Sequence, residues 1–545
     1  MQLIDQHTKK IMEGCKERAR DAGLQFDNES LEYIVTNRDL IEISPKVMIP
    51  TLYDYWVHDV EVLQGEGRYD LYPSNPYETV INTRPAISFY NDNNPDWLNV
   101  MIFYHVLGHI DFFQNNRFFE HTWSDDFKGI ALAHKRLIAR MRSKHQHWVD
   151  YIIEFARGMD NLVPFTKQLY KINQTPKAVS EQKIDFFFDV FVQNRENEKD
   201  QFKYQKWIDR FNEILADSDE KTTRVLFINE VIQKYPEFEE KFKQHNKKKE
   251  EEKESEDLMD YIINNSTFLN KRQNDWMKSV IQVVRQTSLF FAPQIRTKIM
   301  NEGWATYWHE KLFTSDDRIS GHEVDFAKIH AKVTSLNRVG LNPYAIGWRL
   351  FLYAEELADK GKLGFEFEKT LDSKERKSFD KKTGKGQDYI FEIRKQLCDS
   401  LFLRRFIDQD FVDKYRLFVA GKKLNPARRT WQYFVKSRKA EDYLKMLTGS
   451  LFHPPKINFE SGKSGRLILN HKFEERPLVQ EYIKNTLLGI EYLWGKPVEL
   501  NTFEVKSIDE EKQEITWGLV NYTMKEKTLH RSNKNKTKTT KLKEI

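Results

Sequence analysis

The stretch from Trp97 to Phe119 constrains the fold of this chain more than any other. It reads WLNVMIFYHVLGHIDFFQNNRFF and is apolar on nearly every side of a helix until Gln114. A helix that is apolar all round is usually buried on every side. The segment therefore predicts a central helix covered by other elements. His105 and His109 interrupt it, and two imidazoles in such a setting need polar partners or a metal ion.

Helical patterning dominates much of the remaining chain. Residues 131–160 and 183–245 place apolar residues three and four apart with charges between them, as surface helices do. Residues 258–312 continue the helical pattern, and 342–361 begins with Asn-Pro, a helix start signal. Residues 30–90 carry prolines among aromatic residues, and they predict an ordered, largely irregular stretch with short strands.

The C-terminal part has mixed patterning. Residues 466–473, 497–508 and 514–524 alternate like strands, whereas 479–494 between them is helical. The expected fold is therefore mainly α with an α+β section at its C-terminal end. Residues 525–545 are rich in Lys, Thr and Asn and predict a disordered basic tail.

These patterns divide the chain into sections. A single core rarely grows beyond about 250–300 residues, so more than one packing unit is expected. The expected sections are an irregular and helical N-terminal part (1–95), a helical core with the histidine pair (96–244), a charged linker (245–257), a second helical section (258–375), an α+β domain (376–524) and the basic tail (525–545).

Charge and composition exclude several classes of protein. The net charge is +5, but residues 525–545 alone carry eight Lys or Arg against two Glu, so no nucleic-acid groove is expected. No apolar run predicts a membrane span, and the N-terminus lacks the pattern of a secretory signal. Cys15 and Cys398 are far apart, which fits a reducing cytoplasmic location. The phosphate-binding and serine-hydrolase motifs are absent from the sequence.

His105 and His109 are the first candidate metal ligands. Residues four apart lie one above the other on a helix, so their imidazoles can share one ion. This is the spacing of the HExxH zinc helix, but Val106 occupies the position of its general-base glutamate. The alternative is a pair of core histidines hydrogen-bonded to carboxylates, and the apolar surroundings favour the metal.

Glu302 is the third candidate ligand. It lies in NEGWATYWHE (301–310), flanked by Met300 and Trp304. A buried carboxylate is costly unless it is paired or binds a cation. Two His and one Glu with an open water position form a catalytic zinc arrangement. The alternative is a buried glutamate bonded to a His or Arg of another helix.

His309 follows Glu302 by two helical turns and therefore looks the same way. It is a candidate fourth metal ligand, a general acid or base, or a hydrogen-bond partner of a ligand. Because residue 106 cannot act as a base, Glu310 and His134 are candidate catalytic bases. Asp111 is expected to face away from the histidine pair and to support it, and His330 is a candidate supporting partner.

Several blocks of the sequence resemble the SpoVR family. They include YHVLGHIDFFQNNRFF (104–119), FAPQIRTKIMNEGWATYWHEKL (291–312), NPYAIGWRLF (342–351) and LLGIEYLWGKPVELNT (487–502), in family order. The family's HxxGH block falls on 105–109 and its NEGWA block on 301–305. The resemblance also implies family histidines at His134, His309 and His330.

The family is named for a role in forming the spore cortex, a peptidoglycan layer. The resemblance and the residues together suggest a zincin-like metal-dependent hydrolase with zinc on His105, His109 and Glu302. A peptide or cell-wall-related amide is the substrate class that the cortex role suggests. The alternative is a non-catalytic, metal-stabilised scaffold that docks protein partners through its C-terminal domain and tail. Four protein ligands would indicate a structural metal, and three would leave a position for water.

Overall fold

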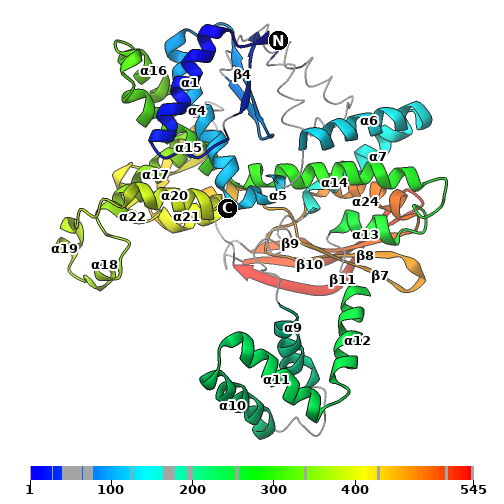
Figure 1. Ribbon diagram of the computed structural model, residues 1–545. Coiled ribbons are helices and arrows are strands. Elements are labelled where there is room, and N and C mark those ends of the chain that lie inside the picture. The colour runs from blue at the N-terminus through cyan, green and yellow to red at the C-terminus, as the bar shows by residue number, and fades with distance from the viewer. Residues whose placement is uncertain are drawn as a thin grey trace. The chain divides into compact units, whose positions relative to one another are not determined.

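The computed structural model describes residues 2–27, 29–37, 39, 64, 78–123, 127–163, 178–192, 201–251, 257–336, 340–425, 430–509 and 514–541 (Figure 1). The chain is mainly helical with a sheet near its C-terminal end, as predicted. It forms two compact units, Met1–Phe165 with Asp257–Ile545, and Thr166–Glu256. Most of the proline-rich stretch predicted to be irregular, including Pro45, Pro50, Pro73 and Pro76, lies outside the described residues.

The smaller unit is a helical cluster around an aromatic core. It contains α9 (Val179–Phe186), a π-helical turn (Phe187–Phe191), α10 (Gln201–Asp217), α11 (Glu220–Lys234) and α12 (Phe238–Glu251). Phe187, Phe227 and Phe238 are almost completely buried at its centre. The charge run expected to form a linker over 245–257 is helical up to Glu251, because α12 continues into it.

Three buried helices form the centre of the larger unit. They are α4 (Asp96–Asn115), α15 (Lys298–Thr314) and α17 (Pro343–Asp359). Every residue of α4 from Leu98 to Phe113 is buried, so the prediction of a helix covered on all sides is confirmed. α17 begins as its sequence predicts: Pro343 occupies the first turn, and the side chain of Asn342 accepts a hydrogen bond from the Ala345 N–H.

A four-stranded sheet lies near the N-terminus. Its strands are β1 (Gln2–Leu3), β2 (Ser30–Val35), β4 (Ala86–Asn91) and β3 (Glu78–Ile81), in this spatial order. The β2–β4 pair is parallel, whereas β1–β2 and β3–β4 are antiparallel. Helix α1 (Gln6–Asp21) connects β1 to β2 and packs against α4.

The C-terminal sheet has five strands. β7 (Ile457–Ser461), β8 (Leu467–His471), β9 (Val498–Asp509), β10 (Glu514–Lys525) and β11 (Thr528–Lys541) lie in the order β11-β10-β9-β8-β7. Only β8 and β9 are parallel neighbours, and α24 (Gln480–Trp494) makes the crossover between them. α24 packs on β9 and β10 on one side and on α7 (Trp148–Arg157) on the other (Figure 1).

The prediction of a disordered tail over 525–545 is wrong for most of its length. Residues Thr528–Lys541 pair with β10 as an antiparallel edge strand. The strand carries lysines and threonines instead of an apolar face, so its composition resembles that of a disordered segment. An edge strand is held by backbone hydrogen bonds and is protected from aggregation by such charges.

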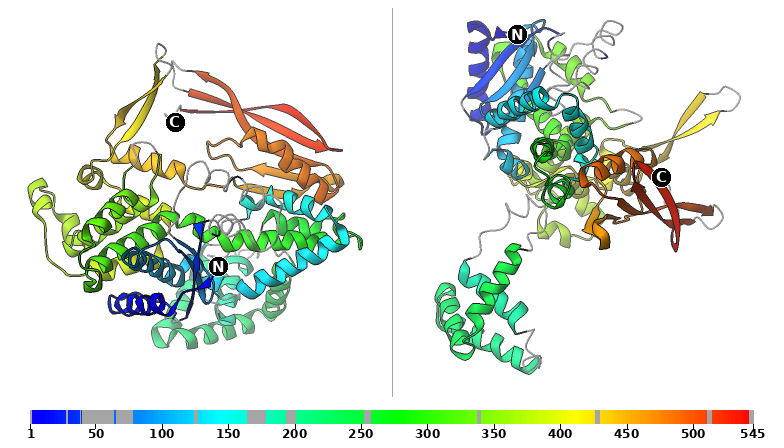
Figure 2. Two further views of the ribbon diagram at one scale, coloured as in Figure 1. Left: turned by 90° about the horizontal axis from the view of Figure 1, so that it is seen from above. Right: turned by 90° about the vertical axis from the view of Figure 1, so that its right-hand side faces the viewer.

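The remaining elements complete the larger unit. A separate hairpin of β5 (Val419–Asn425) and β6 (Thr430–Ser437) projects from the helices (Figure 2). No helix among the described residues is long and apolar enough to cross a bilayer. The other helices are α5 (Glu120–Trp123), α6 (Phe127–His145), α13 (Leu258–Asn265), α14 (Asp275–Arg296), α16 (Glu323–Val333), α18 (Phe365–Lys369), α19 (Ser373–Ser378), α20 (Gly386–Gln396), α21 (Asp399–Phe406), α22 (Gln409–Lys414) and α23 (Ala440–Ser450).

Candidate metal centre

His105, His109 and Glu302 converge in the core of the larger unit. The two histidines come from α4 and the glutamate from α15, and their ligand-capable atoms all lie within 4.8 Å of one another. His105 Nε2 is 3.1 Å from His109 Nε2. The Oε2 atom of Glu302 is 3.6 Å from His109 Nε2 and 3.9 Å from His105 Nε2. Two motifs almost two hundred residues apart in sequence thus present three donor atoms to one point.

These separations fit one tetrahedral zinc ion. Ligands about 2.0–2.1 Å from a tetrahedral Zn²⁺ lie about 3.3–3.4 Å from each other. The three observed separations, 3.1, 3.6 and 3.9 Å, bracket that distance. Small side-chain rotations would therefore bring all three atoms into a first coordination shell.

The carboxylate of Glu302 gives a second indication of a cation. Its side chain is 16% exposed, and its Oε2 atom is buried without a hydrogen-bond donor among the described residues. Burying a carboxylate oxygen without a hydrogen-bond donor lowers stability by roughly several kcal/mol, and a bound cation would remove that loss. The donor set and this oxygen together fit a divalent metal.

A row of hydrogen-bonded imidazoles leads away from the group. His105 Nδ1 is 2.9 Å from His309 Nδ1, and His309 Nε2 is 2.9 Å from His330 Nδ1. His330 Nε2 lies 3.7 Å from Oε1 of Glu310, whose other oxygen accepts a hydrogen bond from Trp348 Nε1. His309 therefore contacts the far nitrogen of the His105 ring. It lies where a hydrogen-bond partner of His105 would lie, which is one of the three roles that the sequence left open for it.

The hydrogen bonds are consistent with the tautomers that metal binding requires. If the Nε2 atoms of His105 and His109 hold a metal, both Nδ1 atoms carry hydrogens. His109 Nδ1 can then donate to Oδ1 of Asn301, 2.9 Å away, and His105 Nδ1 to His309. His105 then donates to His309 and His309 to His330, which leaves the hydrogen of His330 on Nε2, 3.7 Å from a carboxylate oxygen of Glu310. Such partners fix the orientation of ligand histidines in many metal sites.

Burial keeps the imidazoles of this row neutral. The pKa of His105 lies well below its ordinary value because its ring is desolvated and faces His109 and His309. Burial lowers the pKa of His309 in the same way and that of His330 to about 4. Neutral imidazole is the form that binds metals. Burial also raises the pKa of Glu310, against the effect of its hydrogen bond from Trp348.

Glycines allow the helices of the site to approach closely. A Cβ atom on Gly108, between the two ligand histidines, would lie 2.8 Å from Cα of Ala305. A Cβ atom on Gly303, next to Glu302, would lie 2.3 Å from the carbonyl carbon of Gly347. These glycines bring α4 and α17 against the two sides of α15.

Asp111 lies on the side of α4 away from the histidine pair, where its carboxylate makes buried contacts. Its Oδ2 accepts a 2.7 Å hydrogen bond from Trp304 Nε1 and lies 3.3 Å from Nε of Arg394, and its Oδ1 accepts one from the N–H of Gln25. Burial raises the pKa of this carboxyl to about 6 despite the arginine. Asp111 therefore connects α4 to α15 and α20 on the side away from the ligands.

Asp399 is a supporting residue that sequence reasoning missed. Its two carboxylate oxygens accept 2.9 Å hydrogen bonds from the N–H groups of Ile299 and Met300, in the first turn of α15. Asp399, which follows this turn by about a hundred residues in sequence, thus caps the helix that carries Glu302. Burial raises the pKa of Asp399 to about 7. The residues around Asp399 in the sequence do not indicate that its carboxylate caps a distant helix.

A cavity of about 320 Å³ adjoins the site. Its wall includes the rings of His105 and His309 together with the apolar side chains of Met101, Ile102 and Val333. His134, predicted as a catalytic base, is not brought to the group: it lies on α6, where its hydrogen-bond partner is Gln286 of α14. Glu310 is nearer, but two imidazoles separate it from His105.

Comparisons with known proteins point to one family. The model of a family described as "SpoVR like protein" matches residues 3–446. The uncharacterized protein YcgB of Escherichia coli (strain K12) is 23% identical over 334 residues, which is 58% of this chain and 58% of that protein. The chain thus matches little more than half the length of this relative. No solved structure matches the chain.

Proposed function

The chain belongs to the SpoVR family, since the family model covers residues 3–446, and from this premise we propose that it is a zinc-dependent hydrolase of an amide or peptide bond. The family name associates it with sporulation. A peptide or a cell-wall-related amide is therefore the substrate class that we propose.

The number of ligands carries the proposal. Three protein atoms converge, on His105, His109 and Glu302, and the third histidine of the cluster, His309, contacts the far nitrogen of the His105 ring. Catalytic zinc sites have three protein ligands and an open position, whereas structural sites have four. The cavity next to His105 supplies a route for a small substrate group.

Each residue of the site has a role in this proposal. Asn301 and His309 would hold the ligand imidazoles in the tautomer that leaves Nε2 free for the metal. A bound zinc ion would polarise the substrate carbonyl and lower the pKa of a bound water toward about 7. His330 would continue the row, with the carboxylate of Glu310 at its accepting end, and together they would raise the basicity of His105. Glu310 is thus a positioning residue in this proposal, not the base.

A metal-stabilised scaffold is the second candidate. The observation that favours it is Val106, which occupies the glutamate position of HExxH and is completely buried. Glu310, the nearest alternative in the row, is separated from the ligands by His309 and His330. A zinc site without an adjacent base is suited to a structural role.

Metal content and cleavage together test the proposal. Purified wild-type protein should contain about one zinc per chain by elemental mass spectrometry, and His105→Ala and Glu302→Ala should contain almost none. His530→Ala, which changes an exposed histidine on β11, is the matched control and should keep its zinc. Zinc-loaded wild type should cleave members of a mixture of peptides and peptidoglycan stem peptides, with products read by mass spectrometry.

The outcomes separate the candidates. Zinc-dependent cleavage that Glu302→Gln abolishes and His530→Ala retains would establish the hydrolase. One zinc per chain with no cleavage of any peptide would favour the scaffold. No zinc, even after incubation with zinc salts, would contradict both.

A further inference from the structure

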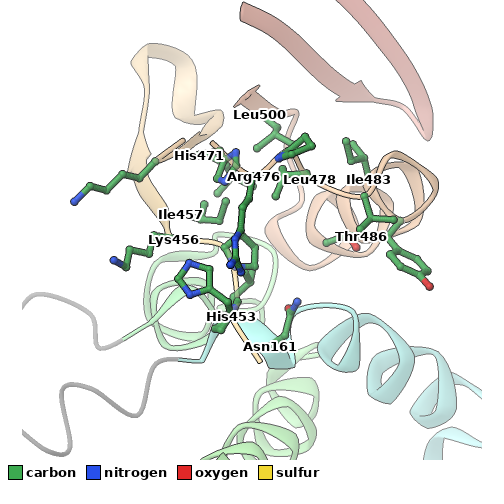
Figure 3. Close-up of a pocket in the computed structure, with 18 of the residues that line it drawn as sticks. Asn161, His453, Lys456, Ile457, His471, Arg476, Leu478, Ile483, Thr486 and Leu500 are labelled. Atoms are coloured by element: carbon green, nitrogen blue, oxygen red, sulfur yellow. The ribbon is translucent and has the colours of Figure 1, made fainter. Parts of the chain in front are cut away.

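A second pocket lies in the C-terminal section, away from the metal group. It has a volume of about 400 Å³ and shares no lining residue with the metal site or its cavity. Its walls come from the start of α24, from β8 and the loops around it, and from the segment after α7 (Figure 3). Most of its lining follows residue 446, where the match to the family model ends.

The floor of this pocket is aliphatic. Leu469, Ile483, Leu487, Ile490 and Leu500 line it, and each is less than 10% exposed. They belong to the core that α24 forms with the sheet. Pockets of about 300–1,000 Å³ with mostly apolar walls and a few polar groups are typical of small-molecule sites. The size and the lining fit a small aliphatic chain.

The rim is basic. Lys456, Lys472, Arg476 and two histidines line the pocket against a single acidic residue, Glu474. Glu474 is already engaged, because Lys456 Nζ lies 2.8 Å and His453 Nε2 3.2 Å from its oxygens. The carboxylate of Glu474 therefore does not neutralise the positive charges of Lys472 and Arg476, and the rim has a net positive charge.

Arg476 is the group best placed to receive an anion. No acidic residue among those that the structure describes forms an ion pair with it. In the view of Figure 3 it lies between Lys456 and Ile457 on one side and Leu478 and Ile483 on the other. The start of α24 is close by, and its N-cap residue, Val479, has no side chain able to accept from the first N–H groups. Both features favour a negative group at the rim.

We infer that this pocket binds an amphipathic anion, with an aliphatic body on the leucine and isoleucine floor and a carboxylate or phosphate at Arg476. The inference does not depend on the metal site, because the two share no residue. The apolar floor selects against ions without a hydrophobic body. The unpaired guanidinium selects against neutral chains.

Calorimetric titration of the full chain tests this inference. The probes are decanoate, decyl phosphate and decanol, each below its critical micelle concentration. Wild type should bind at least one of the two anions, and it should bind decanol at least about tenfold more weakly than that anion. The reason is that a hydrogen bond to a charged group changes affinity by roughly tenfold to hundredfold. A preference for decyl phosphate over decanoate, or the reverse, would identify the headgroup.

Two matched variants make the test specific. Arg476→Gln should weaken anion binding about tenfold or more and leave decanol unchanged. Lys484→Gln changes an exposed lysine of α24 that does not line the pocket, and this variant should bind like wild type. Thermal melting checks that both variants are folded. Failure of wild type to bind either anion, equal binding of decanol, or unchanged affinity in Arg476→Gln would overturn the inference.

Discussion

The indole Nε1 of Trp304 donates a 2.7 Å hydrogen bond to the carboxylate of Asp111. This bond joins the NEGWA helix to the HxxGH helix on the side opposite the three candidate ligands. Both residues are completely buried, and Arg394 lies against the same carboxylate. The helices that carry the three candidate ligands are thus held together by a hydrogen bond that involves none of those ligands.

Trp304→Phe tests this support. The change removes the donor to a buried carboxylate and leaves a smaller ring in the core, so we expect a loss of about 1–3 kcal/mol from the hydrogen bond and more from the cavity. Urea unfolding measures it. Trp431→Phe, on the exposed β5–β6 hairpin, is the control and should change stability by less than about 0.5 kcal/mol. Equal stability of the two variants would contradict the role of Trp304.

Gly303→Ala tests the close packing of α15 on α17. The new methyl group would lie 2.3 Å from a backbone carbon of Gly347, so one helix must move. We expect a net loss of about 1–3 kcal/mol and a lower zinc content, because Glu302 is the next residue. Gly449→Ala, in open space on α23, is the control and should be neutral or stabilising by up to about 1 kcal/mol. A stabilised Gly303→Ala protein would contradict this packing.

His330 should make the fold sensitive to acid. Burial holds its pKa at about 4 in the folded protein, below the 6.5 of an exposed histidine. Between these values the unfolded chain binds the proton and the folded chain does not, so stability falls as the pH drops from about 6.5 to about 4. The difference between these two pKa values corresponds to at most about 3.4 kcal/mol of stability.

The comparison of wild type with His330→Gln isolates this contribution. Free energies of unfolding at pH 7.5 and pH 4.5 are measured for both proteins by urea titration. Wild type should lose about 2–3 kcal/mol more than the variant over this interval. Parallel losses in the two proteins would show that His330 is not buried in its neutral form.

The order of β11 can be measured by hydrogen exchange. The pairing of Thr528–Lys541 with β10 predicts slow exchange at alternate amides of this strand. The β5–β6 hairpin, a ribbon of two strands with exposed faces, should exchange faster and serves as the internal comparison. Exchange of 528–541 at the rate of an unfolded peptide would restore the view of this segment as a disordered tail.

The sequence predicted the mainly helical fold, the C-terminal sheet and the buried setting of the histidine helix. These predictions rest on the periodicity of apolar residues and on the apolar neighbours of the imidazole and carboxylate groups. Both are visible in short stretches of sequence. Burying two imidazoles and a carboxylate is costly unless they have polar partners, and residues 105, 109 and 302 lie close enough to be one another's partners. Metal binding at this point, and the chemistry that a metal would support there, are proposals.

Three features could not be read from the sequence. The first is the partner of His309: helical spacing places His309 on the same face as Glu302 but does not say which residue of another helix it meets. The direction of α4 past α15 then decides which histidine meets which residue: His109 meets Asn301 and His105 meets His309. The cap from Asp399 and the strand formed by 528–541 depend on distant backbone groups and leave no local pattern.

Helix α15 makes four kinds of contact from different sides of its circumference, and His309 shares the side of Glu302. Asn301 and Glu302 face the histidine pair, Gly303 faces α17, Trp304 faces Asp111, and His309 extends the imidazole row. Adding or removing one residue between 301 and 309 would turn everything beyond it by about 100°. A replacement in this segment affects one of these contacts, whereas a change in its length would disrupt several of them at once. Relatives that keep the site should therefore show no gap here.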